Sequence, residues 1–158
     1  KLIKKYMIKK DTNWVYSDKV KEHFFNPKNL VKDTSKLKSY DGIGQVGSPA
    51  CGDMMKFFIK VDKKSEKIID LKWQTFGCGS AIGSTSMLSE MVLEKGGMKV
   101  DEALKLTPMD IVKKLDGLPT HKIHCSVLGD QGLRAAINDY FKKTNQEKRM
   151  VKIKGAHH

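Results

Sequence analysis

The sequence lacks any long apolar run. No stretch approaches the roughly 20 apolar residues that a membrane-spanning helix needs, and no apolar core of a signal peptide stands out. We therefore expect a soluble protein with no membrane partner. At 158 residues, the chain is long enough for one domain with a modest single core.

Cysteine is scarce as well. The chain has three cysteines, Cys51, Cys78 and Cys125, which is too few, and an odd number, for a disulfide scaffold. We interpret them as reduced thiols in a reducing compartment, acting as ligands or nucleophiles. No two of them form a CxxC pair, so any shared site has to be assembled by the fold.

Acidic residues are few at both ends of the chain. Residues 1–10 carry a net charge of +5 and residues 142–154 another +5, out of +12 in total, which leaves +2 for the rest. Basic ends of this kind are typical of solvated tails. No nucleic-acid-binding motif accompanies them, so we expect no nucleic-acid partner.

The composition divides the chain into three parts. We expect a basic, flexible N-terminal segment over 1–15, one folded domain over 16–143, and a basic, flexible C-terminal tail over 144–158. His157 and His158 at the end of this tail resemble the remnant of a purification tag.

The hydrophobic pattern predicts an α+β fold. A small three-stranded antiparallel sheet, packed by about four to five helices, is expected because alternating strands with one apolar face need helices to cover it. The strands are expected at 42–47, 55–61 and 69–75, and the helices at 17–25, 80–95, 101–106 and 108–115 and from about Asp130 to Phe141.

The same pattern assigns faces to the elements. The first helix is predicted to bury Val20, His23 and Phe24, with His23 packing at the edge of that face. The third strand is predicted to turn Ile69, Leu71, Trp73 and Thr75 to one side.

Each cysteine lies in a loop-like segment rich in glycine, proline or serine. The three segments are GSPACGD over 47–53, TFGCGSAI over 75–82 and LPTHKIHCSVLGD over 118–130. Cys51 is expected on a turn between two strands, Cys78 where a strand turns into a helix, and Cys125 just before a helix. A lone cysteine in such a position is often inert and buried. Three together favour one composite site.

Two further donors accompany the thiols, since Asp53 follows Cys51 by two residues and His124 directly precedes Cys125. Three sulfurs, an oxygen and a nitrogen can surround a soft metal centre. A structural zinc site would normally show closely spaced ligand pairs, and a thiol hydrolase would need one cysteine with a positioned base. A third interpretation is an iron–sulfide centre held by the three cysteines, with Asp53 or His124 loosely in the fourth position.

These segments resemble the three ligand segments of the IscU-type (NifU N-terminal-like) iron–sulfur cluster assembly scaffolds. The similarity also includes VYSDKVKEHFFNPKN over 15–29, DEALKLTPMDIVKKL over 101–115 and AAINDYF over 135–141. It covers roughly residues 15–141 and implies a SufE/IscU-like fold.

The resemblance implies a scaffold or carrier protein, not an enzyme. A [2Fe–2S] cluster would be assembled on it from iron and desulfurase-derived sulfur and passed to acceptor apoproteins. Its metal-site positions match Cys51, Asp53, Cys78, His124 and Cys125, with Cys125 as persulfide acceptor and Asp53 as the residue for iron entry and cluster lability. The alternative is a zinc-stabilised protein-binding module without cluster chemistry, and zinc is also expected in the isolated protein.

The resemblance also implies partners. These are a cysteine desulfurase, an Hsp70-type chaperone with its co-chaperone, a frataxin-like regulator, a ferredoxin reductant, acceptor apoproteins and a second copy in a homodimer. Tyr16 matches a tyrosine that the family uses at protein contacts, and Leu118, Pro119 and Lys122 match its chaperone-recognition loop. Thr120 stands where that loop usually has a second proline. The expected location is the cytoplasm in a prokaryote, or the matrix of a mitochondrion or related organelle in a eukaryote.

Overall fold

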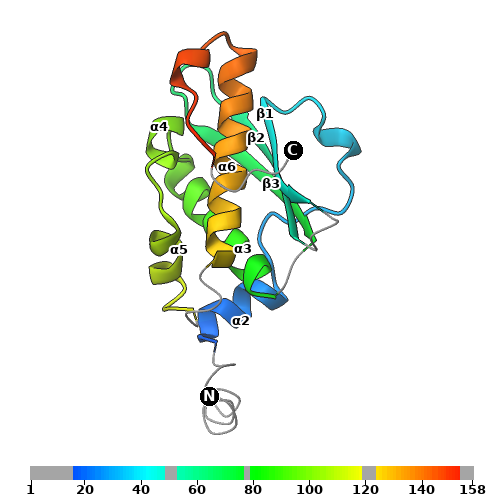
Figure 1. Cartoon of the computed structure of the whole chain (residues 1–158), viewed down its shortest axis with the longest axis vertical. Coiled ribbons are helices and arrows are strands. Elements are labelled where there is room, and N and C mark those ends of the chain that lie inside the picture. The colour runs from blue at the N-terminus through cyan, green and yellow to red at the C-terminus, as the bar shows by residue number, and fades with distance from the viewer. Residues whose placement is uncertain (1–15, 49–52, 77–78, 119–123, 154–158) are drawn as a thin grey trace, which may run out of the picture.

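A computed structural model of the chain describes residues 16–48, 53–76, 79–118 and 124–153 (Figure 1). Within them, a three-stranded antiparallel sheet in the order β1-β2-β3 packs with five α-helices, which confirms the predicted α+β class. The strands are β1 (Gly42–Ser48), β2 (Asp53–Val61) and β3 (Ile68–Phe76), and the helices are α2 (Asp18–Phe25), α3 (Gly79–Leu93), α4 (Val100–Ala103), α5 (Pro108–Lys114) and α6 (His124–Lys143). Short 3-10 turns occur at η2 (Ser35–Leu37), η4 (Glu94–Gly96) and η6 (Glu147–Arg149).

Strand β2 is the centre of the sheet and of the core. Phe57, Ile59 and Val61 alternate along it, as predicted, and are at most 4% exposed. Phe58, on the opposite face, is also buried, and the Nζ of Lys56 lies 5.4 Å from its ring centroid. One face of the central strand is thus continuously apolar, whereas Phe58 shares the opposite face with Lys56 and Lys60.

Strand β3 differs from its prediction at its first residues. Ile68 is fully buried, whereas Ile69 is 54% exposed. The register of β2 with β3 shifts between Lys60 and Val61. A shift of one residue exchanges the faces of a strand, so the predicted alternation holds for Leu71 and Trp73 but is wrong for Ile69.

Helix ends follow their capping signals. The Ser17 side chain accepts a hydrogen bond from the N–H of Val20 at the start of α2, and Thr107 and Asp110 form a capping box around Pro108 at α5. On α2, Val20 and His23 are buried as predicted, but Phe24 is 39% exposed, so its assignment to the buried face is wrong.

Two helices differ in length from their predictions. The helix expected from Asp101 to Leu106 is a single turn, α4, and α3 ends at Leu93, two residues before the end predicted for it. Among the described helices, none has the length and apolar character needed to cross a membrane.

Helix α6 lies directly on β1 (Figure 1). A Cβ atom built at Gly42 would lie 2.2 Å from the carbonyl oxygen of Ala136, and one at Gly44 would lie 2.2 Å from the Ala136 nitrogen. The backbones can therefore approach this closely only because both strand positions are glycine. The Ile43 N–H also donates a 2.8 Å hydrogen bond to the Asp139 carboxylate.

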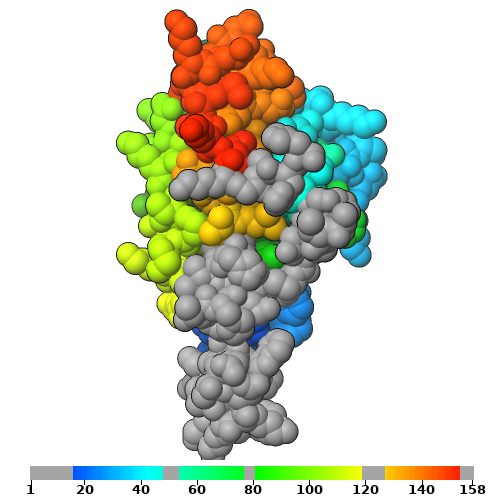
Figure 2. All heavy atoms as spheres, viewed as in Figure 1, coloured from blue at the N-terminus to red at the C-terminus, as the bar shows by residue number. Residues whose placement is uncertain are grey.

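The chain after α6 returns to the body of the protein. The N–H of Val151 donates to Oδ1 of Asn138 at 2.9 Å, and Nδ2 of Asn138 donates to the Val151 carbonyl at 2.8 Å. Ile153 packs against the core. Figure 2 shows these last described residues, in red, lying against the green segment that contains α4. The division of the chain at 143 stays a prediction, but residues 144–153 contribute contacts to the fold.

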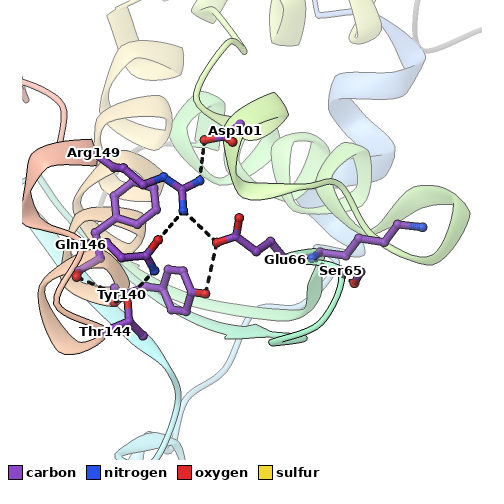
Figure 3. A network of polar contacts seen from close by, with 9 residues as sticks. Ser65, Glu66, Asp101, Tyr140, Thr144, Gln146 and Arg149 are labelled. Carbon is purple, nitrogen blue, oxygen red and sulfur yellow. Dashed lines mark hydrogen bonds and ion pairs between the residues drawn. The ribbon is translucent and has the colours of Figure 1, made fainter.

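Arg149 holds this returning segment in place (Figure 3). Its guanidinium lies 2.8 Å from Glu66 in the β2–β3 turn and 2.8 Å from Asp101 in α4, and 4.4 Å from the ring centroid of Phe141. Gln146 accepts a further bond from it at 2.6 Å. One side chain thus connects three parts of the chain that are distant in sequence.

We expect Arg149→Ala to lower the free energy of unfolding by about 1–3 kcal/mol, because it removes charge-assisted hydrogen bonds at a partly buried position. Arg149→Lys should be intermediate, since an ammonium cannot reproduce the planar fork. Urea unfolding followed by circular dichroism measures both. The neighbouring, exposed Lys148→Ala is the control and should stay within about 0.5 kcal/mol of the parent. Equal stability of Arg149→Ala and Lys148→Ala would contradict the role given to Arg149.

Candidate functional site

The first cysteine-bearing segment connects β1 and β2. Strand β1 ends at Ser48 and β2 begins at Asp53, and these two residues pair across the hairpin. Cys51 belongs to residues 49–52, which lie outside the described residues. The predicted placement of this segment between two strands is confirmed by its neighbours, and Asp53 is the first residue of a strand.

The second segment connects β3 to α3. Phe76, the last residue of β3, pairs with Met54, which directly follows Asp53. Helix α3 begins at Gly79, and Cys78 lies outside the described residues, between the two elements. The strand-to-helix position predicted for it agrees with these bounds. The ends of the first and second segments are therefore adjacent on the sheet.

The third segment leads into α6, which begins earlier than predicted. The helix starts at His124 and not near Asp130. Gly129 concealed the early start in the sequence, because glycine is a poor helix former. Cys125 is consequently the second residue of the helix, where the prediction placed it before the helix.

The packing of α6 brings this third segment to the same end of the sheet. Asp139 contacts Ile43 near the start of β1, so the earlier residues of α6 lie progressively toward Ser48, where β1 ends. A Cβ at Gly132 would lie 3.3 Å from Met55, two residues from the start of β2. Figure 1 shows the first turn of α6 pointing toward the end of the molecule where α2 lies.

The described ends of β1, β2, β3 and α6 that flank the three cysteine segments therefore lie at one end of the fold, although they are distant in sequence. Their described flanking residues include Asp53, His124 and Cys125 as main-chain positions in β2 and α6. Within the described ranges, no group of three His, Cys, Asp or Glu side chains that could hold a metal ion is found. The ligand roles of Cys51, Asp53, Cys78, His124 and Cys125 stay predictions.

The predicted partner-binding residues come from two segments that lie side by side. The Ser17 hydroxyl, next to Tyr16, donates to the carbonyl of Leu115, three residues before Leu118. Lys19 forms an ion pair with Asp116 at 3.7 Å. Tyr16 and Leu118 are both half-buried against the core. Pro119 and Lys122 lie outside the described residues, and a partner-binding role for all four stays a prediction.

A row of buried hydroxyls on α3 was not anticipated from the sequence. Ser84, Thr85, Ser86 and Ser89 are all fully buried. Two of them donate within their own helix, Ser84 to the Ala81 carbonyl at 3.3 Å and Ser89 to the Ser86 carbonyl at 2.7 Å, which satisfies a buried hydroxyl locally. The helical spacing of hydroxyls in GSTSMLSE was the available signal.

Two of these hydroxyls attach the N-terminal elements to α3. The main-chain N–H of Lys28 donates to Oγ of Ser86 at 2.7 Å, and Nδ2 of Asn29 donates to Oγ of Ser89 at 3.0 Å. Nε1 of Trp73 donates to the Lys28 carbonyl at 2.7 Å. The loop after α2 is thereby fastened to both α3 and β3.

His23 takes part in the same junction and is 5% exposed, in agreement with its predicted packing role. Its Nδ1 lies 2.7 Å from Oγ of Ser86, and its Nε2 lies 3.7 Å from the Glu90 carboxylate. Burial lowers the pKa of His23 below its usual value, and the nearby Glu90 opposes this shift only in part. The ring is therefore neutral near pH 7 and can accept a hydrogen bond from Ser86.

A buried carboxylate lies on α6, five residues after Cys125. Asp130 is 2% exposed, and its Oδ2 accepts from Nε of Arg134 at 3.2 Å. Arg134 also donates to the Leu106 carbonyl at 3.1 Å, which ties α6 to the start of α5. Burial raises the pKa of Asp130, against the effect of Arg134. Its Oδ1 has no hydrogen-bond partner in the described part of the chain.

Comparison with known proteins gives one consistent family. The NifU-like N terminal domain profile matches residues 15–147. The chain is 47% identical over 132 residues to iron-sulfur cluster assembly scaffold protein IscU 1 of Archaeoglobus fulgidus, covering 84% of this chain and 80% of that protein. It is 46% identical over 131 residues to iron sulfur cluster assembly protein 2, mitochondrial, of Saccharomyces cerevisiae, covering 83% and 81%.

A longer relative is nitrogen fixation protein NifU of Trichormus azollae. It is 48% identical over 129 residues, which cover 80% of this chain but 42% of that protein. The chain thus spans less than half of this relative and most of the shorter ones.

We expect stability to fall as the pH drops through the ordinary histidine pKa of about 6.5 toward the lower folded-state pKa of His23. Its pKa is lower in the folded than in the unfolded state, so the unfolded chain binds the proton at a higher pH. Acidification therefore stabilises the unfolded state relative to the folded state. His23→Asn keeps an acceptor near Ser86 but does not titrate, so its unfolding free energy should depend less on pH, by at most about 1.4 kcal/mol per pH unit. Urea unfolding at several pH values measures the two slopes, and identical slopes would refute the prediction.

Proposed function

The chain belongs to the NifU-like N-terminal domain family, and on this premise we propose that it is a scaffold on which an iron–sulfur cluster is assembled and from which it is passed on. The relative from Archaeoglobus fulgidus is named a scaffold protein for this process. A scaffold holds its cluster as cargo, so the protein acts as a carrier and not as an enzyme.

The observation that carries the proposal is that the described ends of the strands and helices flanking the three cysteine segments lie at one end of the fold. The β1–β2 hairpin, the β3–α3 connection and the start of α6 each contain one cysteine of the sequence. A cluster with ligands on three separate elements can bind only when those elements are packed together. Binding of the cluster would thus be coupled to the folded state.

The ligand set suits a cluster that is meant to leave. Thiolates of Cys51, Cys78 and Cys125 are soft ligands that iron–sulfur clusters prefer. The fourth position would be held by Asp53 or His124. A carboxylate oxygen binds such a cluster less strongly than a fourth thiolate would, and this weakness would leave one side of a [2Fe–2S] cluster open to transfer.

Sulfur would arrive as a persulfide on Cys125. A cysteine desulfurase transfers a sulfane sulfur to this thiolate, and iron enters beside Asp53. Two electrons then reduce the sulfane sulfur to sulfide and release the Cys125 thiolate as a ligand. We propose a ferredoxin as their source, and a frataxin-like protein as regulator of the step.

Release would involve further partners. An Hsp70-type chaperone with its co-chaperone would bind the segment with Leu118, Pro119 and Lys122, and Tyr16 would contribute to a protein contact. The hydrogen bond from Ser17 to Leu115 supports a common surface for the two segments. Acceptor apoproteins would receive the cluster, and a homodimer is a further proposed assembly.

One of the relatives described above comes from an archaeon, and the one from Saccharomyces cerevisiae is named a mitochondrial protein. We propose a reducing compartment for this chain as well, either the cytoplasm of a prokaryote or the matrix of a mitochondrion or related organelle. Free thiols persist in such compartments.

The proposal is tested by anaerobic incubation of the purified protein with ferrous iron, cysteine and a cysteine desulfurase. Visible absorption that develops only when all components are present supports a scaffold. A protein that stays colourless, but binds zinc tightly, would instead be the zinc-stabilised binding module. Zinc in the isolated protein would be compatible with either result, so the desulfurase-dependent colour decides.

Each of Cys51→Ser, Cys78→Ser and Cys125→Ser should reduce stably bound cluster on the order of tenfold or more, because an alcohol is a poor substitute for a thiolate. Absorption per folded protein after the same incubation measures the loss, and circular dichroism checks the fold. Full cluster occupancy in two of the three variants would show that the cysteines do not form one site. Mass spectrometry should also find persulfide missing specifically from Cys125→Ser, and its location on Cys51 would reassign the acceptor.

Asp53→Ala should have two opposite effects. Assembly from iron and persulfide should slow severalfold, because the oxygen ligand for iron entry is gone, while a chemically reconstituted cluster should persist longer and transfer more slowly. The matched control is Asp62→Ala, which removes a turn aspartate that accepts hydrogen bonds from Ser65 at the other end of β2.

If Asp53 only capped a turn, both substitutions would cost about 1 kcal/mol of stability and leave the cluster unchanged. Assembly and transfer rates are measured separately and normalised to folded protein. Faster transfer from Asp53→Ala than from the parent would assign the labile position to His124.

A further inference from the structure

Thr85 of α3 touches both of the other elements that carry the proposed ligands. It contacts Gly129 of α6 and Met55 of β2, and all three residues are buried. We propose that Thr85 and Gly129 are positioning residues for the cluster site, which set how far apart the starts of α3 and α6 lie. The role in cluster binding rests on the proposed function, whereas the contact between Thr85 and Gly129 does not.

The contact with α6 leaves little room for a side chain at Gly129. A Cβ atom at Gly129 would lie 3.1 Å from Oγ1 of Thr85 and 3.7 Å from Cδ2 of Leu88. The first distance is shorter than ordinary van der Waals contact, so a methyl group there would separate the helices by a few tenths of an ångström. The hydroxyl of Thr85 could move aside only by a change of χ1 rotamer, which the branched Cβ restricts and which would break its hydrogen bond to Met55.

The contact with β2 holds Thr85 from the other side. Its hydroxyl donates to Sδ of Met55 at 3.6 Å, and Met55 is fully buried. Met55 is two residues from Asp53, where β2 begins. The side chain of Thr85 therefore contacts both α6 and β2 from α3, close to the ends of these elements that flank the ligand segments.

The distances along the helices are short. Thr85 is six residues after Gly79 and Gly129 is five after His124, or about 9 and 7.5 Å at the helical rise of 1.5 Å per residue. Helices bend little over one or two turns, so a displacement at the junction also moves the helix starts. Metal–ligand distances tolerate only about 0.2 Å of error, which is comparable to the displacement that a methyl group would cause.

Gly83 offers a matched control on α3 itself. A Cβ there would lie 3.4 Å from the Val20 carbonyl oxygen and 3.5 Å from Cγ1 of Val20, which is ordinary contact with α2. Gly83→Ala and Gly129→Ala make the same chemical change inside a helix and gain the same helix propensity. They differ in whether the added methyl enters the α3–α6 contact.

The first experiment follows chemically reconstituted cluster in the full chain, with its loss to a chelator recorded by visible absorption. We expect Gly129→Ala to lose cluster about fivefold faster than the parent, in the direction seen when groups that support metal ligands are altered. Gly83→Ala should match the parent. Thr85→Ser combined with Gly129→Ala should return to within about twofold of the parent, because a serine hydroxyl can rotate away from the new methyl.

A parent rate in folded Gly129→Ala would overturn the inference, as would an equal effect of Gly83→Ala. If Gly129→Ala does not fold, Thr85→Val replaces it. This substitution keeps the volume but removes the hydrogen bond to Met55 and turns a methyl toward Gly129. It should accelerate cluster loss about twofold, and an unchanged rate would count against the junction.

A second experiment separates this inference from the proposed function. In metal-free protein, a short bifunctional thiol reagent should join Cys78 to Cys125, as located by peptide mass spectrometry. Gly129→Ala should change the rate of this cross-link at least about twofold, whereas Gly83→Ala should not. A parent that builds no cluster but shows this difference would refute the scaffold and keep the junction. No such cross-link in any variant, or equal rates in all, would refute the junction.

Discussion

The close contact of α6 with β1 is the constraint on which the rest of the structure depends. At Gly42 and Gly44 any side chain would collide with the main chain of Ala136, at 2.2 Å. Main-chain atoms cannot move aside as side chains do, so this contact determines how near the helix lies, while the contacts of Gly132 with Phe57 and of Asp139 with Ile43 set its direction. The position of the start of α6, including Cys125, follows from it.

Buried hydroxyls of α3 connect this helix to its neighbours in the interior. The hydroxyls of α3 bind α2 and its following loop through Ser86 and Ser89, and contact β2 through Thr85. Hydroxyl contacts are short and directional, unlike a purely apolar seam. We infer that these contacts keep the helices in one arrangement next to the proposed site. The ligands of that site have to bind a cluster and release it again.

At the end of the sheet opposite the proposed site, charged side chains connect the neighbouring elements. Arg149 joins the β2–β3 turn to α4 through Glu66 and Asp101, and lies over Phe141 (Figure 3). A basic residue of a segment that resembled a solvated tail is thus part of the fold. The molecule is held together at this end by ion pairs, while its other end carries the proposed binding site.

The sequence by itself determined the class of the fold, its elements and the family, because alternation in 55–61, the capping residues Ser17 and Thr107, and the three cysteine segments are local signals. It could not determine the start of α6, since glycine at 129 is locally unfavourable and is explained only by its contact with Thr85. The exposure of Ile69 and the ion pairs of Arg149 likewise depend on partners far along the chain. Which residues meet across such distances is a property of packing, and only the tertiary structure decided it.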